Sequence, residues 1–167
     1  MQPKTPSQSS GLLAHWMGIG DANNANNIHG GTVMKLCDEA ASLAAIRHCR
    51  RRVVTVGVDR LTFLVPIAIG ELVTFKATVN AAWRSSMEVG VRVEAENPRT
   101  GEVRHTTSAY ITMVALDEHG RPATVPPLAP ESELEQRRQR EAELRRANRL
   151  AETNEIQHSR SSVTSAE

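Results

Sequence analysis

Hydrophobic and polar residues alternate along three segments in the second half of the chain. Apolar side chains occupy nearly every second position in residues 72–83, 87–96 and 103–116. A period of two indicates a β-strand with one covered face. The β-branched run 53–61 adds a fourth strand, and the short apolar segment 12–17 adds a first one. We therefore predict an antiparallel sheet of about five strands.

The core side of the sheet follows from the same alternation, and Asn97–Gly101 predicts the turn of a hairpin. The side chains expected to face the core are Val73, Phe75, Ala77, Val79, Ala81 and Trp83, then Met87, Val89, Val91, Val93 and Ala95, then Val103, Thr107, Ala109, Ile111 and Met113.

A different period precedes the strands, in Gly30–Cys49. Small apolar residues recur there at spacings of three and four, which predicts a helix that is rich in alanine. Small side chains let a helix lie close to its surroundings, so we expect deep burial. One helix wrapped by a curved antiparallel sheet is the economical α+β architecture.

The length of 167 residues fits one domain with a real core. The polar residues 1–10 have little to bury and are expected to be disordered, and residues 11–130 form the domain. Residues 131–167 are expected to form a charged, solvated helix that packs weakly, over 131–154, and a disordered Ser-rich end, over 158–167.

Composition excludes several classes of function. A net charge of +1 gives no strong field for nucleic acid, and no apolar run approaches the ~20 residues that span a membrane. Cys37 and Cys49 suggest buried, reduced thiols, so we expect a soluble cytoplasmic protein. The histidines and cysteines lack metal-ligand spacing, and phosphate-loop and dinucleotide motifs are absent. We therefore predict no metal and no cofactor.

Two places could carry chemistry. Gly30 and Gly31 open the predicted helix three and four residues after Asn27. Exposed amides there could stabilise an oxyanion, although two glycines could also serve a tight turn. Asp38 lies about two turns along the helix among small apolar residues. A carboxylate there is costly unless it is paired or functional, but it could also be a surface residue beside Glu39.

These segments carry a family resemblance. Residues 27–41, 54–59, 84–89 and 101–114, with the exit at Val125-Pro126, resemble the cytosolic acyl-CoA hydrolases, including the brain-type enzyme and its small bacterial relatives. As an ordered set these motifs are specific. The resemblance implies a hotdog fold and hydrolysis of acyl-CoA, with coenzyme A as part of the substrate.

The resemblance also implies a site shared between subunits. Asn27 from one subunit and Asp38 from the other would act together, Asp38 as general base or nucleophile, in a homodimer that assembles further into a trimer of dimers. The residues expected to bind CoA are Val56, Gly57, Val58, Ser85, Ser86 and Met87 by resemblance, with Arg60 and Arg84 as our own candidates for its phosphates.

Two other functions are compatible with the same fold. A hotdog enoyl-CoA hydratase would need an acidic residue at position 24, where this chain has Asn24, and an amide cannot act as general base. A non-catalytic acyl-CoA sensor would carry a DNA-binding module, for which about ten residues ahead of the first strand leave too little room. Both alternatives are therefore weaker than a hydrolase.

Overall fold

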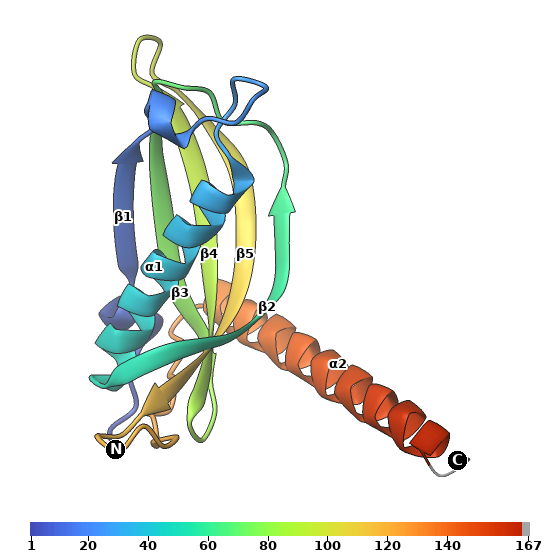
Figure 1. The fold of residues 1–167 in the computed structure, drawn as a ribbon. Coiled ribbons are helices and arrows are strands. Elements are labelled where there is room, and N and C mark those ends of the chain that lie inside the picture. The colour runs from blue at the N-terminus through green and yellow to red at the C-terminus, as the bar shows by residue number, and fades with distance from the viewer. Residues whose placement is uncertain (165–167) are drawn as a thin grey trace.

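The computed structural model describes residues 1–164 and forms one sheet with two long helices (Figure 1). The elements in chain order are a 3-10 turn η1 (Pro6–Ser9), β1 (Gly11–Trp16), a second turn η2 (Ile19–Asp21), α1 (Gly30–Cys49), β2 (Arg52–Phe63), β3 (Leu72–Ala82), β4 (Ser86–Asn97), β5 (Glu102–Leu116) and α2 (Glu133–Thr164). The five strands pair antiparallel in the order β1-β3-β4-β5-β2. The predicted α+β architecture is confirmed, and no helix among the described residues could cross a membrane.

Helix α1 lies along the concave inner face of the sheet (Figure 1). His29 caps its first turn, and Arg50 ends it in a left-handed conformation. The alanine-rich side of α1 lies very close to β1. A Cβ added at Gly11 of β1 would lie 2.8 Å from the carbonyl oxygen of Ala40. Alanine therefore matters here for its size, as the sequence predicts.

The predicted core alternation holds along β3 and β4 and along most of β5. Two residues are exceptions. Trp83, just beyond the end of β3, is half-buried, and its ring centre lies 4.8 Å from the Arg146 guanidinium of α2. Val103 is 57% exposed. A register shift follows Val93 on β4, where Val93 pairs with Thr107 and Glu94 with His105, so Thr106 is an extra residue. Such a bulge reverses which side chains face the core, and Val103 lies beyond it.

Helix α2 crosses the outer face of the sheet and then extends well away from it (Figure 1). Most of α2 is exposed, in line with a charged, solvated helix, and Ala142 is the fully buried residue of its described side chains. The helix attaches through Arg145, which makes two hydrogen bonds to Glu88 of β4, rather than through a leucine stripe. The helix also continues to Thr164 rather than becoming disordered at His158. Residues 165–167 lie outside the described part.

The N-terminal residues differ from the expected disorder. Ser9 is buried, and its hydroxyl hydrogen-bonds Nδ1 of His48 at 2.9 Å. The ammonium of Lys4 donates to the carbonyl oxygen of His48 at 2.6 Å, at the end of α1. Polar residues are thus ordered here because they satisfy the free groups of a helix C-terminus.

Candidate active site

The loop before α1 is held by its own polar side chains. The carboxylate of Asp21 accepts from the Gly18 amide at 2.8 Å and contacts His15 at 3.1 Å. The Gly18 amide and then His15 lower the pKa of Asp21, since both favour the charged carboxylate. The carbonyl oxygen of Asp21 accepts from the His29 amide at 2.8 Å. Asp21 therefore fixes both ends of the loop that carries the asparagines.

The two predicted glycine amides are not equivalent. The amide of Gly31 donates to Nδ1 of His29 at 2.9 Å, so the cap already occupies it. The amide of Gly30 has no hydrogen-bond partner among residues 1–164. Of the predicted donors, Gly30 is therefore the one free to bind an oxyanion.

An apolar cavity of about 430 Å³ lies at this end of α1. Its lining residues are Asn23, Asn27, Ile28, Gly30, Val33, Phe63, Leu64, Val65, Pro66 and Ile67. Most of the wall is hydrocarbon, with two carboxamides and one free helical amide at one side. Apolar cavities with a few convergent polar groups are the usual form of small-molecule sites.

The two asparagines of this cavity are held differently. The side-chain oxygen of Asn23 accepts from the amides of Ala25 at 2.8 Å and Asn27 at 3.3 Å. The side-chain nitrogen of Asn23 has no partner within the described chain, so an anchored group keeps a free donor. The nitrogen of Asn27 makes one long contact to the Ala25 carbonyl oxygen, at 3.4 Å. The sequence analysis selected Asn27 and not Asn23, although both belong to the same asparagine-rich loop.

Asp38 lies farther along α1 and is half-buried. The hydroxyl of Thr55, on β2, donates a hydrogen bond to its carboxylate. Its neighbour Cys37 is fully buried, and desolvation, followed by the Asp38 charge, raises the pKa of that thiol to about 12. Cys37 therefore stays protonated and is a poor nucleophile. Thr55, which the sequence analysis did not select, fixes the carboxylate against β2.

Some of the residues predicted to bind CoA lie on the strands close to Thr55, which holds Asp38. Thr55 pairs with Met113 and Met113 with Met87, so Val56 and Ser86 lie close to one row of the sheet. Val56 and Val58 are exposed on the edge strand β2, and Arg60 and Arg84 are also exposed. The side chain of Met87 is fully buried in the core. Only its backbone could therefore face a ligand.

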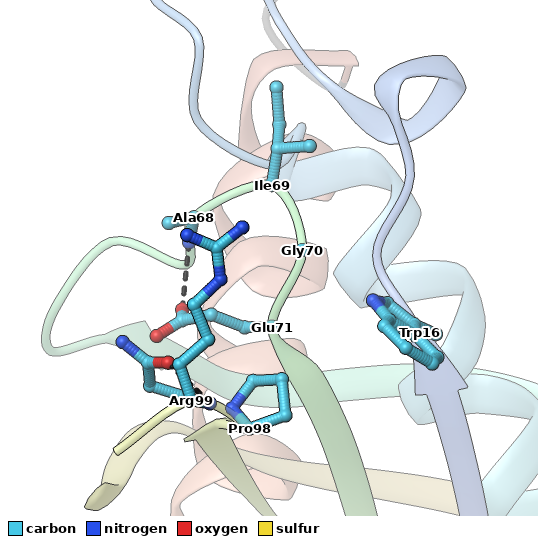
Figure 2. A pocket seen from close by; sticks show the side chains of 8 residues that line it. Trp16, Ala68, Ile69, Gly70, Glu71, Pro98 and Arg99 are labelled. Atoms are coloured by element: carbon cyan, nitrogen blue, oxygen red, sulfur yellow. Dashed lines mark hydrogen bonds between the residues drawn. The ribbon is translucent and has the colours of Figure 1, made fainter.

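A larger hollow of about 570 Å³ contains none of the predicted residues (Figure 2). Trp16 and Arg99 line its opposite sides, with the loop that carries Ile69 between them. The carboxylate of Glu71 accepts from the Ala68 amide at 2.8 Å and pairs with Arg104 at 2.9 Å. Glu71 and Arg104 therefore stabilise the loop that carries Ile69. No cluster of three metal-ligating side chains occurs within residues 1–164.

Comparisons with known proteins identify the family of this chain. Residues 25–102 match the thioesterase superfamily. The chain is 43% identical over 115 residues to the uncharacterized acyl-CoA thioester hydrolase YkhA of Bacillus subtilis, covering 69% of this chain and 67% of that protein. The chain belongs to the thioesterase superfamily.

Solved structures extend the similarity to nearly the whole chain. An acyl-CoA hydrolase from Staphylococcus aureus, in complex with butyryl-CoA and CoA, superposes with a TM-score of 0.86 at 32% identity, covering 93% of this chain and 95% of that one. A hexameric acyl-CoA thioesterase gives 0.88 at 35% identity, covering 92% and 98%. The predicted hotdog fold is therefore confirmed.

Proposed function

We propose that this protein hydrolyses acyl-CoA thioesters to a free fatty acid and CoA. The observation that carries the proposal is the apolar cavity beside a free helical amide and an anchored asparagine, since a thioester needs an apolar acyl site and oxyanion donors. The similarity to a hydrolase solved with butyryl-CoA supports the same substrate class. The cytoplasmic location stays a prediction.

Asp38 is the proposed general base or nucleophile, and Thr55 holds its carboxylate. The S. aureus enzyme has been solved as three single variants. Alanine replaces an asparagine at its position 28 in one, an aspartate at 43 in another and a threonine at 60 in the third. Asn23, Asp38 and Thr55 have the same chemical identities and the same spacings of fifteen and seventeen residues. This agreement supports a role for all three residues.

The same spacing favours Asn23 over Asn27 as the catalytic asparagine. Asn23 is also the better anchored of the two, because two backbone amides hold its oxygen while its nitrogen stays free. A fixed amide donor can orient the thioester carbonyl or the attacking water without reorganising. We therefore propose Asn23 for this role and leave Asn27 as part of the cavity wall.

The active site is proposed to combine residues of two copies of the chain. Asp38 lies eight residues after Gly30 on α1, which is about 12 Å along the helix axis. The base and the oxyanion donor of one chain are thus too far apart to act on the same carbonyl. Some solved relatives are hexameric, and a twofold dimer would bring Asp38 of one copy to Gly30 and Asn23 of another. A trimer of such dimers would account for a hexamer.

The proposed reaction has a simple atomic balance. Asp38 takes a proton from water as the water oxygen attacks the thioester carbon, or its own oxygen attacks first and water then cleaves the acyl-enzyme. The negative oxygen of the intermediate accepts hydrogen bonds from Gly30 and Asn23. The carbon–sulfur bond breaks. In the first route the CoA sulfur receives the proton that Asp38 took from water, and in the second route CoA leaves as the thiolate and takes a proton from the water that cleaves the anhydride. CoA is proposed to lie along Val56–Val58 and Ser85–Met87, with Arg60 and Arg84 near its phosphates.

Complementation between two inactive variants tests the shared site. Asp38→Asn and Asn23→Ala should each lose most turnover of an acyl-CoA while still binding CoA. Mixed after reversible dissociation, they should recover about a quarter of wild-type activity, because half of random dimers are mixed and each contains one intact site.

Asn24→Ala is the matched control, since Asn24 is an exposed neighbour in the same loop. It should keep near-normal turnover. No recovery on mixing would contradict the shared site. Full activity of Asn23→Ala together with loss of activity in Asn27→Ala would show that Asn27, and not Asn23, is the catalytic asparagine.

A further inference from the structure

Three consecutive large apolar residues are exposed where β2 ends. The exposed fractions are 51% for Phe63, 52% for Leu64 and 40% for Val65. Such a run is costly on a soluble surface unless something covers it. All three line the cavity that also contains Asn23 and Gly30. The exposed hydrocarbon therefore opens onto the proposed reaction centre.

The wall formed by these residues is fixed at both ends. The amide of Leu64 donates to the carbonyl oxygen of Thr106 on β5 at 2.8 Å. The amide of Ile28 donates to the carbonyl oxygen of Ile67 at 2.9 Å, which joins the wall to the asparagine loop. A wall held by backbone hydrogen bonds keeps its distance from the catalytic groups, so its side chains define the space available.

Phe63 lies at the reacting end of this wall. A Cβ placed on Gly30 would come within 3.2 Å of the Phe63 ring, so the ring packs against the residue that carries the free amide. A thioester whose carbonyl oxygen binds the Gly30 amide would begin its acyl chain beside this ring. The ring therefore takes up space that the first acyl carbons would otherwise use.

We propose that the wall Phe63–Pro66 binds the acyl chain and that Phe63 determines which chain lengths are accepted. This inference rests on the proposed thioesterase function and deepens it. The hydrocarbon wall selects apolar acyl groups over polar ones. The Phe63 ring limits the room beside the carbonyl and thus disfavours long or bulky chains.

Opposite changes in ring size provide the test. We expect Phe63→Ala to raise the ratio of kcat/KM for palmitoyl-CoA over butyryl-CoA by about tenfold or more, since a few methylenes in an apolar pocket discriminate at this level. Phe63→Trp should lower the same ratio. Val103→Ala is the matched control, because Val103 is a similarly exposed apolar residue outside the cavity lining. It should leave the ratio unchanged.

The outcomes separate this inference from the function on which it rests. An unchanged ratio in both Phe63 variants, with hydrolysis retained, would overturn the inference. Dimer dissociation without a change in ratio, measured by sedimentation, would show that a neighbouring subunit covers Phe63 instead. A wild-type protein that cleaves no acyl-CoA would overturn the proposed function itself. If Phe63→Ala does not fold, Phe63→Trp and Phe63→Leu carry the same test.

Discussion

The two faces of the sheet are covered by helices of opposite character. On the inner face, α1 presents mainly Ala and Cys to a layer of Val, Met, Ile and Phe. On the outer face, α2 presents arginines to carboxylates and aromatic rings. Glu88 is 0% exposed there, and Arg145 holds it with hydrogen bonds of 3.0 and 2.7 Å. One sheet thus contacts one helix through close packing and the other through charge pairing.

The outer face has further polar contacts of the same kind. Asn80 donates to Glu88 at 3.1 Å, and the Arg145 guanidinium lies 3.7 Å from the centre of the Tyr110 ring. Arg149 pairs with Asp59 of β2. The two faces therefore differ in how much stability is lost when a single side chain is removed. Burial of hydrocarbon is non-directional, whereas a buried charge is costly as soon as its partner is removed.

Removing the guanidinium of Arg145 should have the largest effect on stability. Arg145→Leu leaves the carboxylate of Glu88 buried without its cation, so we expect a loss of about 3–5 kcal/mol in the free energy of unfolding. Urea unfolding followed by circular dichroism measures it. Arg146→Leu, which removes only a contact 4.8 Å from the Trp83 ring centre, should cost about 1 kcal/mol or less. Equal losses in the two variants would contradict the distinction.

Crowding the inner face should have the next largest effect. Gly11→Ala places a Cβ against the backbone of α1, which cannot yield easily, so we expect a loss of about 1–3 kcal/mol. Gly20→Ala is the control, because its Cβ would meet no atom within 4 Å. A wild-type melting temperature for Gly11→Ala would show that the helix can move away from β1.

A smaller, pH-dependent effect is expected at the end of α1. Burial lowers the pKa of His48, whose ring bonds Ser9 and the carbonyl oxygen of Pro126. A lowered histidine pKa means that the fold prefers the neutral ring. The stability that the neutral His48 ring contributes is fully present above pH 6.5, the ordinary pKa of histidine. It is lost as the pH falls from 6.5 through the lowered pKa.

The free energy of unfolding in urea should therefore fall more between pH 7.5 and pH 5.5 for the wild type than for His48→Gln. His119→Gln, at an exposed histidine, should retain the wild-type difference. An equal fall in the free energy of unfolding for His48→Gln and the wild type would show that other groups cause the pH dependence.

Removing both members of the outer pair should recover part of the stability that Arg145→Leu loses. Glu88→Leu combined with Arg145→Leu leaves no buried charge but removes the acceptor of Asn80, so the double variant should lie above Arg145→Leu alone and about 1–3 kcal/mol below wild type. The urea series used for the single variant measures this recovery. A double variant less stable than Arg145→Leu would mean that the pair contributes more than its own desolvation.

Much of the fold and part of the site followed from local sequence patterns. Alternation identified the inner faces of β3 and β4, and the spacing of alanines identified α1. The glycines at the start of that helix indicated the free amide, which the structure narrows to Gly30. The sequence analysis selected Asn27, whereas our proposal selects Asn23, and both stand in one polar loop. Their hydrogen bonds depend on how that loop folds back on itself.

The sequence by itself determined what depends on near neighbours: which residues form strands, which face is apolar, and where a small-residue helix begins. Only the tertiary structure decided that Arg145 meets Glu88, 57 residues away, that Thr55 meets Asp38, and that Phe63 closes on Gly30. The side-chain period of a strand or a helix is a property of the local backbone. A contact between distant segments depends instead on register, bulges and the direction in which a helix leaves the sheet.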